Sequence, residues 1–298
     1  MKVAALDLGS NTFLCLICEV EEKKIAKIYS DEVRVVRLGQ GLSSSKKFHP
    51  EALQRAREAL LEFRKQIDIH QPDKVLAMAT AAARDAENKE ELFKICDDLQ
   101  IPLQIITGLD ESKITYQGSV SAFDDQLKRL VIDIGGRSTE FILGQGLNFI
   151  SGHSHNLGCV KLTEEYISKY PVSPEDLKKC HQEIEEKLIE TKKMITEPID
   201  QILAVAGTPT ALAAAEIGRF EAGLIDSYQL TKSSLEKWKT KLAQASVQEI
   251  EKMGIPAGRA DVILVGVLIL LETLKVFNKD TITVSTRGVR YGVALQMV

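Results

Sequence analysis

The stretch that decides the fold of this 298-residue chain is LDLGSNT at residues 6–12, which returns in altered form as IDIGGRST at residues 132–139. Each copy is an apolar strand pattern with one aspartate, followed by glycine and small hydroxylated residues. A second repeat joins KVLAMAT at residues 74–80 to QILAVAG at residues 201–207. The offsets of the two repeats, 126 and 127 residues, agree, and this agreement predicts a chain built by duplication.

Between the repeated segments, the first half carries strand patterns and then a helix pattern. Residues 25–28 and 33–38 are predicted strands, and residues 51–67 place their apolar side chains on one stripe of a helix. The order of elements is therefore strand, strand, strand, helix, strand.

The second half repeats that order. Residues 141–143 and 148–150 are predicted strands, and Ser173-Pro174 supplies an N-cap and a first residue for a helix. A further helix is predicted around residues 231–245, where we interpret Trp238 as a packing residue rather than a ligand residue.

Strands that alternate with helices predict an α/β fold, and the duplication predicts two similar domains around an interdomain cleft. The polar residues 124–126 interrupt the pattern, which places the domain boundary near residues 122–128. We therefore expect one domain at residues 1–124 and the other at residues 125–298, with residues 287–298 packing back onto the first domain. Ligand is expected to bind between the halves.

The charges of the chain nearly cancel: 42 acidic and 38 basic residues leave a formal net charge of −4. No long block of like charges is present to form a nucleic-acid-binding tail. A polyanionic ligand would have to be held by local cations and backbone N–H groups, because the field of the whole molecule is weak. Nucleic acid is therefore not an expected partner.

The sequence also carries expectations about location. The longest apolar stretch, residues 262–271, is ten residues long, whereas a membrane span needs roughly 18 or more. We interpret it as a buried helix, and we expect no membrane partner. Five scattered cysteines suit reduced thiols, and the N-terminus lacks a secretory pattern, so we expect a cytoplasmic protein.

The two glycine-containing segments have the form of phosphate-binding turns, in which backbone N–H groups approach an anion and hydroxyl groups donate to it. A third small-residue turn follows the strand pattern at residues 201–205. The alternative is that all three are ordinary strand-to-turn junctions. The candidate phosphate-binding residues are Gly9, Ser10, Asn11, Thr12, Gly135, Gly136, Arg137, Ser138, Thr139, Gly207 and Thr208.

Asp7 and Asp133 end the two equivalent first strands. We expect them to face each other and to hold a hydrated Mg²⁺, or another divalent cation. Magnesium usually keeps several waters and uses one or two carboxylates together with substrate phosphate, which fits so sparse a pair.

Six motifs along the chain together resemble the successive signatures of the exopolyphosphatase and guanosine pentaphosphatase (Ppx/GppA) family. They occur in the family's order and cover nearly the whole chain. They are DLGSNT at residues 7–12, ATAAARDA at 79–86, GLDE at 108–111, IDIGG at 132–136, STE at 138–140 and RGVRYG at 287–292.

The resemblance implies two duplicated actin-like domains of the ribonuclease H-like (ASKHA) kind. It implies hydrolysis of the terminal phosphate of inorganic polyphosphate or guanosine pentaphosphate with a divalent cation, in a homodimer. Glu111 matches the residue that activates water, and Glu140 matches a second acid of the catalytic centre. Arg84 matches the family's arginine, which suits phosphate oxygens in bidentate geometry.

The chain departs from the family pattern in three places. Arg137 stands where a third glycine is usual, and Asp110 replaces a glutamate. An all-helical region that continues longer members is not part of this sequence. Two alternatives therefore stay open: a sensor that binds polyphosphate or guanosine tetra- or pentaphosphate with little turnover, and a phosphotransferase of the same superfold.

Overall fold

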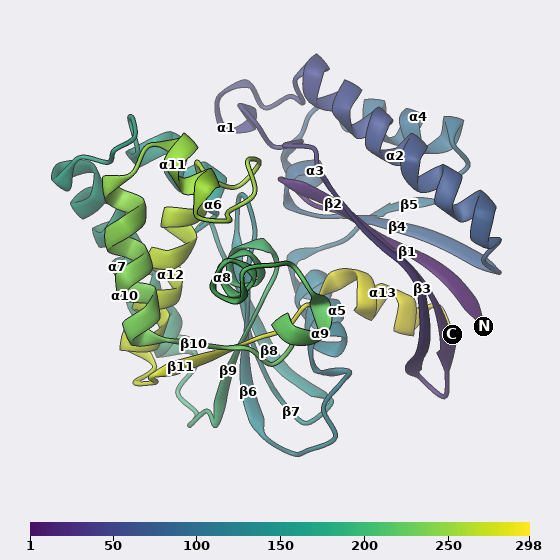
Figure 1. Cartoon of the computed structure of the whole chain (residues 1–298). Helices are drawn as coiled ribbons and strands as arrows, with labels where there is room; N and C mark the ends of the chain where they lie inside the picture. Colours follow the sequence, from purple (N-terminus) through teal and green to yellow (C-terminus); the bar gives the residue numbers. More distant parts are fainter. The chain divides into compact units, whose positions relative to one another are not determined.

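The computed structural model describes residues 1–298, apart from the side chain of Ser43. The chain divides into two compact units. Unit 1 comprises residues 1–122 and 288–298, and unit 2 comprises residues 123–287. Figure 1 shows the elements of each unit, and each unit is described by itself below.

Unit 1 is built on a five-stranded sheet in the order β3-β2-β1-β4-β5. The first three strands form an antiparallel meander, and the last two run parallel to β1. The strands are β1 (Lys2–Leu8), β2 (Thr12–Glu21), β3 (Lys24–Val35), β4 (Lys74–Ala79) and β5 (Leu103–Ile105).

Helices cover both faces of this sheet, and each face has its own apolar cluster. One cluster includes residues of α2 and α4, and the other includes residues of α5 and α13. Cys15 belongs to the first cluster and Cys18 to the second, so the two thiols point to opposite faces of β2. The helices of unit 1 are α1 (Leu42–Ser45), α2 (Pro50–His70), α3 (Ala81–Asp85), α4 (Glu90–Asp98), α5 (Gly108–Val120) and α13 (Val289–Gln296).

Unit 2 is built on a six-stranded sheet in the order β10-β11-β9-β6-β7-β8. Its strands are β6 (Lys128–Ile134), β7 (Thr139–Gln145), β8 (Asn148–His155), β9 (Gln201–Val205), β10 (Gln229–Thr231) and β11 (Thr281–Val284). Its helices are α6 (Cys159–Tyr166), α7 (Pro174–Met194), α8 (Gly207–Ile217), α9 (Ala222–Ile225), α10 (Lys232–Gln244), α11 (Val247–Lys252) and α12 (Ile263–Val276).

The two sheets confirm the duplication that the sequence predicts. The run β8-β7-β6-β9-β11 repeats the order of β3-β2-β1-β4-β5, with the same antiparallel meander followed by parallel strands. β10 is an addition that pairs antiparallel with β11. The architecture is therefore the duplicated actin-like α/β fold.

Most of the predicted elements are present. The apolar stripe of the helix predicted at residues 51–67 is buried in α2, and the predicted N-cap Ser173 accepts a hydrogen bond from the backbone N–H of Asp176 at 3.1 Å. α10 lies within the range predicted around residues 231–245, and Trp238 is buried there as predicted. α12 is buried along nearly its whole length. Among the described residues, no helix is long and apolar enough to cross a membrane.

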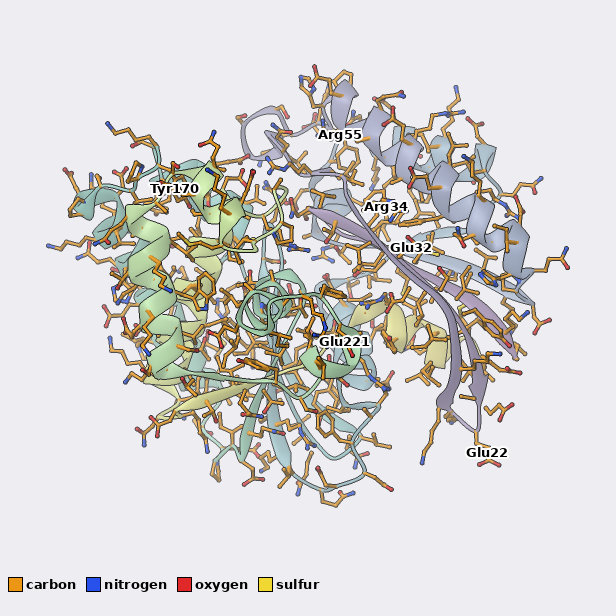
Figure 2. The ribbon with its side chains drawn as sticks, in the orientation of Figure 1. Glu22, Glu32, Arg34, Arg55, Tyr170 and Glu221 are labelled. Atoms are coloured by element: carbon orange, nitrogen blue, oxygen red, sulfur yellow. The ribbon has the colours of Figure 1, made fainter. Side chains whose placement is uncertain are left out.

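One prediction about the strands is wrong. The segments at residues 25–28 and 33–38 belong to a single strand, β3, which ends at Val35. The polar residues between them stay in the strand because β3 is an edge strand, where polar side chains find partners without disrupting the sheet. Asp31 accepts hydrogen bonds from Arg290. Glu32 pairs with Arg34, and both of these residues are labelled in Figure 2.

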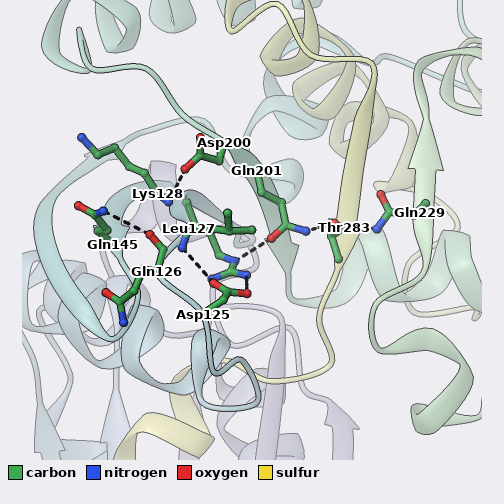
Figure 3. A network of polar contacts seen from close by, with 10 residues as sticks. Asp125, Gln126, Leu127, Lys128, Gln145, Asp200, Gln201, Gln229 and Thr283 are labelled. Carbon is green, nitrogen blue, oxygen red and sulfur yellow. Dashed lines mark hydrogen bonds and ion pairs between the residues drawn. The ribbon is translucent and has the colours of Figure 1, made fainter.

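A partly buried polar network fixes the start of the unit 2 sheet (Figure 3). The Arg129 guanidinium donates to both carboxylate oxygens of Asp125 at 2.7 Å, and its Nε donates to Gln201 Oε1 at 2.7 Å. Gln201 and Gln229 each donate to Thr283 Oγ1 at 2.8 Å. The network links β6, β9, β10 and β11, so the ends of four strands are held together by satisfied hydrogen bonds.

Candidate functional site

The turn between β1 and β2 is closed by a hydrogen bond from Gly9 N–H to Thr12 C=O at 3.0 Å. A Cβ atom at Gly9 would lie 2.9 Å from that same oxygen, so a side chain cannot be added without moving the turn. Asp7, which precedes the turn, and Ser10 within it are both buried. The sequence-predicted glycine is therefore required by the geometry of the turn.

Asn11 lies at the centre of this turn. Its carbonyl oxygen accepts hydrogen bonds from the backbone N–H groups of Val36 and Arg37 at 3.0 and 2.9 Å, which clamp the turn to the chain after β3. Its side-chain Nδ2 is buried and has no hydrogen-bond partner among the described residues. A buried donor without a partner costs stability, and an anionic oxygen would satisfy it.

The turn between β6 and β7 has the same construction. Gly135 N–H donates to Ser138 C=O at 2.9 Å, and a Cβ atom at Gly135 would lie 2.9 Å from that oxygen. The carbonyl of Gly136 accepts from the backbone N–H groups of Val160 and Lys161, at 2.9 and 3.0 Å. Both turns are therefore rigid glycine turns, each held by the chain that follows the third strand of its sheet.

Arg137 occupies the position in the second turn that Asn11 has in the first. It is 8% exposed, and the chain passes so close to it that a Cβ atom at Gly158 would fall about 2.1 Å from Arg137 Cα. Thr139, which follows in β7, donates its hydroxyl hydrogen to the carbonyl of Leu157 at 2.6 Å. The Thr139 hydroxyl therefore holds the turn in place.

Two carboxylates lie side by side in the second turn. Asp133 and Glu140 are directly opposite each other on β6 and β7. Glu140 is 2% exposed and accepts a hydrogen bond from the Ser154 hydroxyl at 2.7 Å. Like charges directly opposite on neighbouring strands repel, so this pair fits a bound divalent cation with oxygen ligands.

Glu111 is the buried acid of unit 1. It lies in the first turns of α5, where Thr107 is the N-cap and accepts a hydrogen bond from Asp110 N–H. Glu111 is 6% exposed, and Arg84 donates to its Oε2 at 2.7 Å. Arg84 also donates to the carbonyl of Ile106 at 2.9 Å, so its orientation is fixed from two sides.

Its neighbour Asp110 behaves differently. Asp110 is exposed and only accepts a hydrogen bond from the Thr107 hydroxyl at 2.7 Å. Of the two acids in the motif, only Glu111 is removed from solvent and held by a cation. Residue type alone does not show this difference.

The third predicted turn begins α8. Ala206 has a left-handed backbone angle (φ +68°), which is unusual for a residue with a side chain and indicates a constrained turn. A Cβ atom at Gly207 would lie 1.6 Å from the guanidinium of Arg259, so a side chain there would require that guanidinium to move. Thr208 is buried beside it.

Sequence reasoning missed Arg259. Burial lowers its pKa, yet it has no ion-pair partner among the described residues. Its position in the sequence, just before an apolar helix, resembles any helix-flanking charge. Only the contact with Gly207 places Arg259 beside the third candidate phosphate-binding turn.

The structure brings together Arg84 and Glu111 in unit 1, and Asp133 and Glu140 in unit 2. Among the described residues, no group of three or more His, Cys, Asp or Glu side chains forms a ready-made metal site. The sharing of a cation by Asp7 and Asp133 stays a prediction.

Turns rich in donors suit phosphate groups, and a buried carboxylate suits the activation of water. The fold and these residues together indicate a phosphohydrolase of the actin-like class. The chain belongs to the Ppx/GppA phosphatase family, whose model matches residues 16–298.

Three known proteins illustrate the similarity. The chain is 28% identical to exopolyphosphatase 2 of Mycobacterium tuberculosis over 314 aligned positions, covering 99% of this chain and 98% of the relative. It is 29% identical to the guanosine-5'-triphosphate,3'-diphosphate pyrophosphatase of Photobacterium profundum, covering 99% of this chain and 59% of the relative. An exopolyphosphatase structure from Cytophaga hutchinsonii superposes with a TM-score of 0.91 at 27% identity, covering 100% of this chain and 97% of that one.

Proposed function

We propose that this phosphohydrolase releases terminal orthophosphate from inorganic polyphosphate or guanosine pentaphosphate, using a water molecule activated by Glu111. The observation that carries the proposal is the buried Glu111 carboxylate, held by Arg84 at 2.7 Å. The names of two relatives, an exopolyphosphatase and a guanosine pentaphosphate pyrophosphatase, support these two substrates.

Glu111 orients the attacking water and accepts its proton as the bond to phosphorus forms. A carboxylate in this role contributes about 10²- to 10⁴-fold to the rate. Little acid catalysis is needed at the other end, because a polyphosphate leaving group is a weak base. Arg84 fixes the carboxylate through one guanidinium nitrogen, and its remaining N–H groups are suited to phosphate oxygens.

The glycine turns hold the phosphate chain through backbone N–H groups and side-chain donors. Asn11 Nδ2 is a free donor in the first turn. Arg137 adds a cation to the second turn, and Arg259 adds one to the third. Together these groups supply the local positive potential that a chain of net charge −4 lacks as a whole.

A divalent cation, expected to be Mg²⁺, is assigned to Asp133 with Asp7 as the second carboxylate. The opposed carboxylates of Asp133 and Glu140 fit such an ion, because hard oxygen ligands are what it prefers. When bound, the cation neutralises charge on the phosphate oxygens. Glu140, positioned by Ser154, completes the acidic environment of that ion.

The first experiment measures phosphate release from short polyphosphate, long polyphosphate and guanosine pentaphosphate in the presence of Mg²⁺. We expect Glu111→Gln to lower release by about 10²- to 10⁴-fold with an unchanged fold. The matched control is Asp110→Asn, which changes an exposed acid one residue away and should leave release near the wild-type rate.

Three results would contradict the proposal. Wild-type protein that binds these substrates without releasing phosphate would point to a sensor, and formation of ATP after addition of ADP would point to a phosphotransferase. A Glu111→Gln variant with full activity would remove Glu111 from its role.

The same preparation, examined by light scattering, tests the expected homodimer. Fractionation of cells tests the expected cytoplasmic location.

A further inference from the structure

A cavity lies within unit 2, at the end of α8 that is remote from the candidate phosphate turn. It has a volume of about 530 Å³, within the range of small-molecule sites. Ala215 and Glu216 of α8 line it, together with residues of α10 and Met253 after α11. Since α8 rises about 1.5 Å per residue, Glu216 lies roughly 13 Å along the helix from Gly207.

The floor of this cavity is apolar and held in place. Ala215, Met253 and the indole of Trp238 contribute to it. Trp238 Nε1 donates to Glu216 Oε1 at 2.8 Å, and the Tyr228 hydroxyl donates to Glu216 Oε2 at 2.8 Å. The polar atom of the indole is therefore satisfied internally. Trp238 is 9% exposed, so its ring contributes a small apolar surface in a fixed orientation, with Lys241 Nζ 5.8 Å from the ring centroid.

The rim of the cavity is positively charged. Lys237 and Lys241 are one helical turn apart on α10, so they lie on the same side of the helix. Within the described part of the chain, neither lysine has an ion-pair partner, whereas Lys239 between them pairs with Glu236. Against these two cations stands one carboxylate, Glu216, and both of its oxygens already accept hydrogen bonds.

We propose that this cavity binds an aromatic phosphate, of which a nucleoside monophosphate is the simplest example. The flat ring lies on the floor formed by Ala215, Trp238 and Met253, and the phosphate lies between Lys237 and Lys241. Apolar and aromatic surface at the floor with a few polar groups at the rim is the usual composition of such sites. The proposal does not depend on Glu111 or on the reaction assigned to it.

Trp238 makes this proposal directly testable, because it is the single tryptophan of the chain. The intrinsic fluorescence of the whole protein is titrated with guanosine monophosphate, adenosine monophosphate, inorganic phosphate and guanosine. We expect a saturable change with the monophosphates, and a dissociation constant at least about tenfold weaker for phosphate alone and for guanosine alone, since each has half of the contacts.

Matched variants on α10 separate this site from others. The double variant Lys237→Gln/Lys241→Gln should weaken the monophosphate by about tenfold or more, whereas Lys239→Gln should leave the titration unchanged. Glu111→Gln should also titrate like the wild type, which distinguishes the cavity from the candidate catalytic residues. All of these lysines reach solvent, and far-UV circular dichroism checks that the variants are folded.

Three outcomes would overturn the proposal: no saturable fluorescence change, equal responses to inorganic phosphate and to the monophosphates, or a titration unaffected by the double lysine variant. Loss of the signal in Glu111→Gln would place the nucleotide at the candidate catalytic residues and would also overturn it.

Discussion

The two glycine turns share one backbone and differ in their charge. Gly9 and Gly135 make equivalent hydrogen bonds of 3.0 and 2.9 Å, and a Cβ atom added to either glycine would lie only 2.9 Å from a carbonyl oxygen. On the strand opposite the aspartate, however, the first turn has Leu14, whereas the second has Glu140. The two copies therefore share a backbone, and only the second has paired carboxylates.

The comparison shows that the backbone shape of a turn and the charge beside it can vary independently. Under the proposed function, both turns hold phosphate through backbone and side-chain donors, since that role depends on the shared backbone. Only the second has the pair of oxygen ligands that suits a divalent cation. The predictions below test this division, starting with the largest expected effect.

Removing the second acid of the pair should abolish the charge difference between the turns. We expect Glu140→Gln to lower phosphate release by about 10²- to 10³-fold, because a preorganised electrostatic group is lost. Release is measured over a range of Mg²⁺ concentrations, and the variant should need more Mg²⁺. Leu14→Met, at the equivalent position of the first turn, is the control and should behave as wild type. An unchanged Mg²⁺ response in Glu140→Gln would show that the second turn is not the cation site.

Adding a methyl group to either glycine should damage both turns alike, since their backbones are the same. We expect Gly9→Ala and Gly135→Ala each to lower the free energy of unfolding by about 1–3 kcal/mol, and phosphate release by about tenfold to a hundredfold. Denaturant unfolding and phosphate release measure the two effects. Gly223→Ala is the control, because a Cβ atom there meets nothing within 4 Å. Damage at one turn alone would break the equivalence.

The donor in the centre of the first turn should act through binding. Asn11→Asp places a negative charge where a phosphate oxygen is expected, so we predict a KM raised by roughly tenfold with a smaller change in kcat. Asn11→Ala, which removes the donor without adding charge, should raise KM less. Steady-state kinetics separate the two constants. A KM unchanged in both variants would mean that the unpartnered Asn11 amide does not contact substrate.

The smallest effect concerns pH. His155 ends β8 opposite Thr139, whereas the equivalent residue of the first sheet, Arg34 opposite Phe13, keeps its charge. Burial lowers the His155 pKa below its ordinary 6.5. The unfolded chain therefore binds this proton more readily, and the contribution of neutral His155 to stability is present above pH 6.5 and lost as the pH falls through and below it.

We accordingly expect the free energy of unfolding to fall less between about pH 7 and about pH 5 in His155→Gln than in the wild type. Denaturant titrations at several pH values measure this slope. If the free energy of unfolding changes with pH equally in wild type and His155→Gln, His155 makes no pH-dependent contribution to stability.

Repetition and periodicity were sufficient to predict much of the fold. The repeat of residues 6–12 at residues 132–139 required two similar sheets, and the apolar stripe at residues 51–67 required α2. The interruption predicted inside β3 was wrong, because the partner of Asp31 is Arg290, a residue 259 positions away. Local pattern carries no information about such a distant contact.

The candidate site shows the same limit. Glycines and hydroxylated residues mark a phosphate turn by their type and order, so the turns were visible in the sequence. The burial of Glu111 depends on Arg84, 27 residues away, and the place of Arg259 depends on its contact with Gly207. Neither feature can be read from local sequence. Glu111 was therefore identified through the family resemblance, and Arg259 was identified only from the structure.

The return of α13 to unit 1 has a consequence for biosynthesis. Val289, Tyr291, Val293 and Ala294 complete an apolar cluster of the first sheet, and Arg290 pairs with Asp31 at 2.7 and 2.9 Å. The ribosome makes these residues only after all of unit 2 (123–287). The first part of the protein to be translated is therefore the last to complete its apolar core. While unit 2 is being made, the face of the unit 1 sheet that α13 covers is accessible to chaperones.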